Sequence, residues 1–218
     1  MIDFAAARRM MVDGQIRTND VTDLRLIAAM LSVPRERFVP VQKQAIAYFD
    51  CDIPVGDSSR FLLKPMVLAK LIQAAAVGSG DRVLDVACAT AYSSAVLARL
   101  AGRVVALEED ATLARIAVWS LQDVEAHNVT VVRGPLAGGW PAEAPYDVIL
   151  LNGTTEIVPQ ALLRQLKDRG RLVGLLGRAP IGKATIYRSD GGHVTTQQIF
   201  EAASPLLPGF AKPTEFVF

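Results

Sequence analysis

The sequence contains only two cysteines, Cys51 and Cys88, and only two histidines, His127 and His193. Two thiols are too few for the disulfide framework of a small secreted domain, and they exclude a zinc site built from four thiolates. Neither histidine has further ligands at metal-binding spacing, so we expect no metal site. This cysteine content is typical of reduced thiols in a cytoplasmic protein.

The sequence also lacks an excess of either charge and a long apolar run. Its 23 Lys and Arg and 22 Asp and Glu give a net charge of +1, whereas binding through nucleic-acid phosphates requires a basic excess. The N-terminus carries acidic residues and has no apolar segment typical of a signal peptide. Uncharged apolar stretches such as 148–152 and 172–177 are far shorter than the roughly 20 residues of a membrane span. We therefore expect no nucleic-acid partner and no membrane segment.

The chain nevertheless has ample material for a globular core, because 51% of its 218 residues are hydrophobic. In the first forty residues, apolar side chains recur at helical spacing. Thr22 and Asp23 are placed to cap a second helix, and Val33-Pro34 to end it. Residues 41–65 show no period and predict a long loop, after which Pro65 suits the first turn of another helix.

From Gly78 onward, short apolar strands alternate with helices. Strands are expected at 82–86, 104–107, 129–132, 146–151 and 171–176, and helices at 91–101, 110–126 and 158–167. Strands that are apolar on both faces predict a mostly parallel, doubly wound α/β sheet covered by helices. Residues 184–188 and 194–201 are expected to add antiparallel strands at the C-terminal edge.

Glu108 ends the second of these strands, where an open α/β sheet binds its ligands. An acidic side chain at this point accepts both hydrogen bonds from a ribose diol. The alternative interpretation is a solvated charge at a strand end.

The loop after the first strand lacks the glycines that its position requires. A G-x-G-x-G pattern lets the backbone turn sharply and approach a ligand, but Ala87, Ala89 and Ala91 occupy these three places. If the positions need a positive φ, each alanine costs about 1–2 kcal/mol. Cys88 in the same loop is either a reactive thiol or a small packed side chain.

Motifs along most of the chain resemble the protein-L-isoaspartate O-methyltransferases, which are class I methyltransferases that use S-adenosylmethionine. The resemblance runs from about residue 8 to 178, and its N-terminal part distinguishes this family from other class I methyltransferases. The matching segments include Gln15-Ile16-Arg17, Val21-Thr22-Asp23, Val33-Pro34-Arg35, Phe38-Val39-Pro40, Gly80-Asp81-Arg82-Val83-Leu84-Asp85-Val86, Gly139-Trp140-Pro141, Ala144-Pro145-Tyr146-Asp147 and Gly170-Arg171-Leu172-Val173.

The resemblance implies a Rossmann-like class I methyltransferase fold and a set of residues around S-adenosylmethionine. The implied cofactor-binding residues are Asp85, Ala87, Cys88, Ala89, Ala91, Glu108, Gly134, Pro135 and Leu136. Pro135 stands where the family has the acidic residue of a Gly-Asp-Gly loop.

The family also carries a substrate-holding serine in a Gln-Thr-Ile-Ser-x-Pro segment. Counting back from Pro65, Leu63 occupies this serine position, and Ser58 or Ser59 is an alternative source of the hydroxyl. No catalytic residue is therefore assigned firmly.

The resemblance implies one methyltransferase domain over residues 1–218. Its parts are a helical cap and substrate-side loop (1–65), a cofactor-binding core (66–178), and C-terminal edge strands with a tail (179–218). The implied reaction transfers a methyl group to a carboxylate of an isoaspartyl protein or peptide, as in protein repair. Two alternatives remain open: a non-catalytic module that binds a ligand or a protein partner, and a methyltransferase with a more apolar acceptor suggested by Phe61-Leu62-Leu63.

Overall fold

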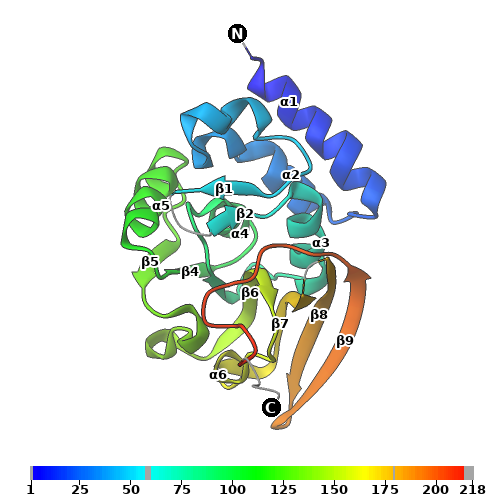
Figure 1. The fold of residues 1–218 in the computed structure, drawn as a ribbon, viewed down its shortest axis with the longest axis vertical. Coiled ribbons are helices and arrows are strands. Elements are labelled where there is room, and N and C mark those ends of the chain that lie inside the picture. Colours follow the sequence, from blue (N-terminus) through cyan, green and yellow to red (C-terminus); the bar gives the residue numbers. More distant parts are fainter. Residues whose placement is uncertain (1, 57–59, 179, 214–218) are drawn as a thin grey trace, which may run out of the picture.

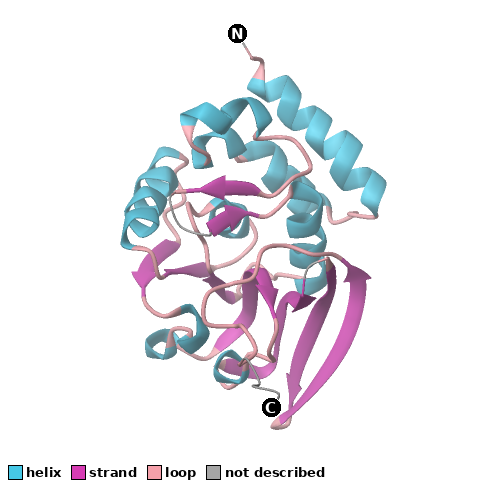
Figure 2. Ribbon diagram, in the orientation of Figure 1, coloured by secondary structure: helices cyan, strands magenta, loops and turns pink. Residues whose placement is uncertain are grey.

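A seven-stranded sheet forms the centre of the computed structural model, which describes residues 2–56, 60–178 and 180–213 (Figures 1 and 2). The strand order is β5-β4-β3-β6-β7-β8-β9. The first five strands in this order are mutually parallel, β8 pairs antiparallel with β7, and β9 pairs antiparallel with β8. The strands are β3 (Arg82–Val86), β4 (Arg103–Glu108), β5 (Val129–Arg133), β6 (Tyr146–Thr155), β7 (Leu166–Arg178), β8 (Ile181–Asp190) and β9 (His193–Glu201). The predicted fold class, with its antiparallel C-terminal edge, is confirmed.

Helices pack on both faces of this sheet because alternate strand residues point to opposite sides. On one face, α3 (Pro65–Ala75), α4 (Tyr92–Ala98) and α5 (Ala111–Asp123) share a core with residues such as Val83 and Val104. On the other face, α6 (Gln160–Leu163) and the C-terminal segment share a second core with Leu84 and Val105. None of the helices in the described part of the chain has the length and apolar content to span a lipid bilayer.

The N-terminal helices form a cap over the first of these faces (Figure 1). The cap contains α1 (Phe4–Met11), a π turn (Val12–Ile16), a 3-10 turn (Arg17–Asn19), α2 (Leu24–Ser32) and two further 3-10 segments, Arg35–Phe38 and Val41–Ile46. Asp23 caps α2 as predicted, since its carboxylate accepts hydrogen bonds from the N–H groups of Arg25 and Leu26. Pro65 begins α3, also as predicted.

The structure corrects the prediction of a long loop over residues 41–65. Besides the 3-10 segment, this region contains an antiparallel pair of short strands, β1 (Ile53–Val55) and β2 (Arg60–Leu62). Three-residue strands have too few alternations to be read from a sequence. The pair lies above the carboxyl edge of the central sheet and brings β2 to the loop that follows β3 (Figure 1).

The helix expected over 158–167 is also shorter than predicted. It ends after the four residues of α6, and β7 begins at Leu166 rather than at residue 171. The reason is a competing tertiary bond: the N–H of Tyr146 donates to the carbonyl of Gln165 at 2.9 Å, which aligns the chain with the start of β6.

The chain order places a topological switch point between β3 and β6. From β3 the chain moves outward through β4 and β5, and it then returns to the other side of β3 as β6. Ligands of open α/β sheets bind beyond the carboxyl ends of strands at such a point. The functional site is therefore expected beyond Val86, Glu108 and the end of β6.

Candidate functional site

The loop after β3 keeps the backbone shape of a glycine loop although it is built from alanine. Ala87, Ala89 and Ala91 have φ values of +66°, +53° and +73°. Each costs about 1–2 kcal/mol in this left-handed conformation. The strained shape is held by neighbouring backbone: the N–H groups of Ala87 and Cys88 donate to the Leu107 carbonyl at 2.9 and 3.1 Å.

The methyl groups of this loop are part of the protein core. All three alanines are at most 1% exposed and pack within the two apolar clusters. The cavity that touches the loop, with Phe61, Leu68 and Asn152 among its lining residues, has a volume of about 10 Å³. That space holds at most one water molecule.

Glu108 is fully buried and forms an ion pair with Arg60, which is 4% exposed. The guanidinium donates through Nη2 to Oε2 at 2.8 Å and through Nε to Oε1 at 3.2 Å. Arg60 belongs to β2, so the strand pair that the sequence did not predict supplies the partner of a predicted site residue.

Backbone groups occupy the remaining capacity of the Glu108 carboxylate. Oε2 accepts from the N–H of Ala89 at 2.8 Å, and Oε1 accepts from the N–H groups of Glu109 and Asp110 at 2.9 and 3.1 Å. A carboxylate has about four lone-pair positions, and Arg60 with these three amides provides donors for all of them. Glu108 therefore has no acceptor left for a ribose diol while Arg60 stays in place.

Asp85, in β3, is also enclosed. Its Oδ2 accepts from the hydroxyls of Ser93 and Ser94, and its Oδ1 accepts from the Asn152 amide at 2.6 Å. Burial raises the pKa of Asp85 to about 6, and the three hydrogen bonds oppose this shift. This carboxylate ties β3, α4 and β6 together.

Cys88 is 1% exposed, and burial raises the pKa of its thiol well above the usual range, with the carboxylates of Glu108 and Asp85 adding to the shift. A buried thiol with a raised pKa is a poor nucleophile. The geometry agrees with the small packed side chain rather than the reactive thiol.

Gly134, Pro135 and Leu136 follow β5 at the outer end of the same edge. Leu136 is buried in the second core, and a Cβ on Gly134 would meet the Trp140 ring at 3.3 Å. An open hollow of about 480 Å³ is lined by Gly134, Pro135, Arg133 and Glu109. No described residue of the alanine loop lines it.

Of the substrate-side candidates, Leu63 reaches this edge, where it lines the small cavity beside Ala87 and Cys88. Leu63 is 3% exposed, and its carbonyl accepts a hydrogen bond from the buried Arg35 at 2.8 Å. Leu62 is buried as well, so most of the Phe61-Leu62-Leu63 run, which suggested a more apolar methyl acceptor, belongs to the protein core. Ser58 and Ser59 lie outside the described residues.

Sequence reasoning missed Arg60 and Asn152. The sequence held no signal for Arg60, because Arg60 and Lys64 both flank the apolar Phe61-Leu62-Leu63 run and nothing local distinguishes them. The described residues contain no cluster of three or more His, Cys, Asp or Glu side chains suited to a metal ion.

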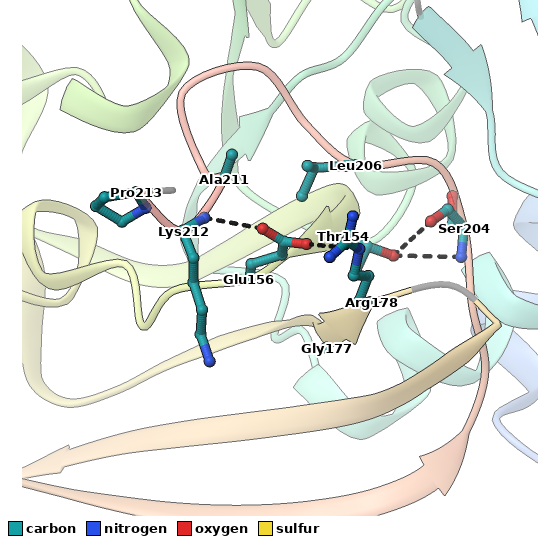
Figure 3. A pocket seen from close by; sticks show the side chains of 9 residues that line it. All are labelled: Thr154, Glu156, Gly177, Arg178, Ser204, Leu206, Ala211, Lys212 and Pro213. Atoms are coloured by element: carbon teal, nitrogen blue, oxygen red, sulfur yellow. Dashed lines mark hydrogen bonds and ion pairs between the residues drawn. The ribbon is translucent and has the colours of Figure 1, made fainter. Parts of the chain in front are cut away.

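A second and larger cavity was also not predicted. It has a volume of about 700 Å³ and lies at the carboxyl ends of β6 and β7, beneath the C-terminal segment (Figure 3). Its lining residues are Thr154, Glu156, Gly177, Arg178, Ser204, Leu206, Ala211, Lys212 and Pro213.

Comparisons with known proteins identify the lineage. The family model of protein-L-isoaspartate(D-aspartate) O-methyltransferase (PCMT) matches residues 7–201. A protein-L-isoaspartate O-methyltransferase of Methanoregula boonei is 36% identical over 192 residues, covering 88% of each chain. One of Methylorubrum extorquens is 39% identical over 191 residues, covering 85% of this chain and 80% of that protein.

Solved structures agree in fold. A protein-L-isoaspartate O-methyltransferase structure superposes with a TM-score of 0.80 at 23% identity, covering 93% of this chain and 66% of that one. A Plasmodium falciparum protein assigned to the same enzyme, in complex with S-adenosyl-L-homocysteine, gives a TM-score of 0.78 at 14% identity, covering 94% and 97%. The resemblance expected from the sequence is confirmed, and the chain belongs to the protein-L-isoaspartate O-methyltransferase family.

Proposed function

We propose that this chain is a member of its family that acts by binding, with the family's cofactor site closed by its own side chains. The family is one of S-adenosylmethionine-dependent methyltransferases that act on isoaspartyl proteins. Methyl transfer depends on a bound methyl donor, so the first question is whether the residues at the switch point fit S-adenosylmethionine.

The residues at the switch point do not fit S-adenosylmethionine in this structure. The space beside the alanine loop is about 10 Å³, whereas pockets for ligands of that size measure about 300–1,000 Å³. Glu108, which would hold a ribose diol, is filled by Arg60 and three backbone amides. The Arg60–Glu108 ion pair is the observation that carries the proposal.

Opening this site would require Arg60 to leave. Separation of the pair would leave an uncompensated carboxylate in a buried position, which costs about 3–5 kcal/mol. The closed arrangement is therefore supported by the electrostatics of this buried pair.

The second candidate is the family reaction itself: transfer of a methyl group from S-adenosylmethionine to an isoaspartyl carboxylate in a damaged protein. The 36–39% identity to enzymes of this name over most of the chain favours it. Under this candidate, the cofactor would have to replace Arg60 at Glu108. An isoaspartyl protein is then the partner, whereas the first candidate predicts a different protein or ligand.

For either candidate we propose a cytoplasmic location. The two cysteines are free, one of them buried inside the fold.

A methylation assay distinguishes the two candidates. Purified protein is incubated with an isoaspartyl hexapeptide and S-adenosylmethionine carrying a radioactive methyl group, and methanol released from the methyl ester is counted. The proposal expects no turnover above the rate without protein. Turnover that depends on the isoaspartyl residue, and that is absent with the matching aspartyl peptide, would establish the second candidate and overturn the first.

A further inference from the structure

The cavity at the carboxyl ends of β6 and β7 has rigid walls. The C-terminal segment is attached to β6 by a series of backbone hydrogen bonds: Thr154 N–H to the Pro205 carbonyl at 3.0 Å, Leu207 N–H to the Thr154 carbonyl at 2.9 Å, and Glu156 N–H to the Phe210 carbonyl at 2.9 Å. These bonds fix the segment over the strand, so the cavity is a built feature of the fold.

Most hydrogen-bond acceptors in this cavity are already committed. The Thr154 hydroxyl donates to the Ser204 carbonyl at 2.7 Å and accepts from the Ser204 N–H at 3.2 Å. The Glu156 carboxylate accepts from the Lys212 N–H at 2.8 Å, and its other oxygen lies 3.5 Å from Nε of Arg178 (Figure 3). The negative charge of Glu156 is thus compensated within the wall.

The donors, in contrast, are available. Arg178, whose side chain is 88% exposed, provides guanidinium N–H groups, and Lys212 provides an ammonium. Ser204 also lines the cavity, but its Oγ is buried and presents no donor to it.

The remaining wall is apolar and is formed by Leu206, Ala211 and Pro213. With one compensated carboxylate and two cations, the cavity offers donors and a net positive charge beside an apolar surface. The complementary ligand carries an acidic acceptor group attached to a small aliphatic body.

We propose that this cavity binds a carboxylate next to an aliphatic side chain, as at the C-terminus of a peptide. In this arrangement Arg178 and Lys212 face the carboxylate, and Leu206 contacts the aliphatic part. The site is separate from the alanine loop, so the proposal stands whether or not the chain transfers methyl groups.

A pair of probes that differ in one group tests the chemistry. N-acetylleucine carries the carboxylate, and N-acetylleucinamide replaces it with a neutral amide. Each is titrated into ¹⁵N-labelled full-length protein at 150 mM salt, and backbone amide shifts are followed. We expect saturable binding of N-acetylleucine with a dissociation constant near 1 mM, with shifts centred on residues 154–156 and 204–212, and at least tenfold weaker binding of the amide.

Variants then locate the site. Arg178→Gln/Lys212→Gln is expected to weaken N-acetylleucine binding about tenfold or more, since charge-assisted hydrogen bonds are lost. Arg164→Gln, an exposed arginine outside the cavity, is the matched control and leaves binding unchanged.

Three results would overturn the proposal: no saturation up to 50 mM N-acetylleucine, equal binding of the amide, or equal binding by the Arg178→Gln/Lys212→Gln variant. Inorganic phosphate serves as a further probe, and phosphate binding as tight as that of N-acetylleucine would contradict recognition of a carboxylate with an aliphatic body.

Discussion

Two parts of the same sheet edge differ sharply in this protein. At the carboxyl ends of β3 and β4, the two buried carboxylates are enclosed and have their partners: Glu108 with Arg60, and Asp85 with two serines and Asn152. At the carboxyl ends of β6 and β7, a cavity of about 700 Å³ is bordered by exposed cations. The first part has become core, and the second has the free polar groups expected of a binding site.

The comparison shows how a ligand site closes without a change of fold. The backbone of the alanine loop keeps three positive φ values that a glycine loop would have. The difference lies in what fills the site. The methyl groups of the three alanines fill the space beside the loop, and Arg60 forms the hydrogen bonds that Glu108 would otherwise offer to a ligand. Family membership therefore predicts the scaffold at this edge better than it predicts the chemistry there.

The largest expected effect concerns access to the closed region. Cys88 is 1% exposed, whereas Cys51 is partly exposed. In the native protein, a thiol reagent at pH 8 should modify Cys51 at least about a thousandfold faster, because an opening that costs about 4 kcal/mol must precede reaction at Cys88. Cys51→Ser and Cys88→Ser variants assign the two rates. Comparable rates would mean that the loop is open in solution.

The next effect concerns the buried ion pair. Arg60→Met should lower the free energy of unfolding by about 3–5 kcal/mol, since it leaves Glu108 charged and buried without its cation. The double variant Arg60→Met/Glu108→Gln should recover part of this loss, because glutamine keeps an acceptor for the backbone amides. Urea unfolding measures both.

A surface pair serves as the control for that experiment. Arg17→Met removes an exposed ion pair with Asp13 and should cost less than about 1 kcal/mol. If Arg60→Met costs no more than Arg17→Met, the ion pair does not hold the site closed.

A third prediction uses pH to test whether Asp85 is enclosed. Its pKa is raised from 3.8 to about 6 by burial, so between pH 4 and 6 the unfolded chain loses a proton that the folded protein keeps. Stability contributed by this group is therefore lost as pH rises. Relative to Asp85→Asn, the wild-type protein should lose about 3 kcal/mol across that window. Urea unfolding at several pH values measures the difference, and a difference that does not vary with pH would show that Asp85 is solvated.

The smallest effect is expected in the alanine loop. Replacing Ala87, Ala89 and Ala91 with glycine relieves about 1–2 kcal/mol of strain at each position, but gives up about 0.8 kcal/mol of methyl burial and about 0.5–1 kcal/mol of chain entropy. The terms nearly cancel, so thermal unfolding should change little. Ala95→Gly, a buried alanine within α4, has no strain to relieve and should cost about 2 kcal/mol. Equal losses at the loop and the helix would argue against positive φ values.

The sequence predicted what depends on local patterns. The strand at 82–86, the cap at Asp23 and the helix start at Pro65 are confirmed to the residue, because short apolar runs, capping residues and a first-turn proline are read from neighbouring side chains. The replacement of glycine by alanine was also visible, although its positive φ values were not.

What escaped prediction depends on contacts between distant residues. Arg60 meets Glu108 across 48 positions, and Ser204 meets Thr154 across 50. Neither pairing has a local signal, and β2, which positions Arg60, is only three residues long. The closed state of one region and the open cavity of the other could therefore be found only in the folded structure.

Calorimetric titration of the wild-type protein with S-adenosylhomocysteine tests the central claim most directly. Because Glu108 is fully occupied and the adjacent cavity holds at most one water molecule, we predict no binding heat at ligand concentrations up to about 1 mM, a free energy weaker than about −4 kcal/mol. Saturable heat with a dissociation constant near 1 μM, about −8 kcal/mol, would contradict the account. It would show that S-adenosylhomocysteine displaces Arg60 from Glu108.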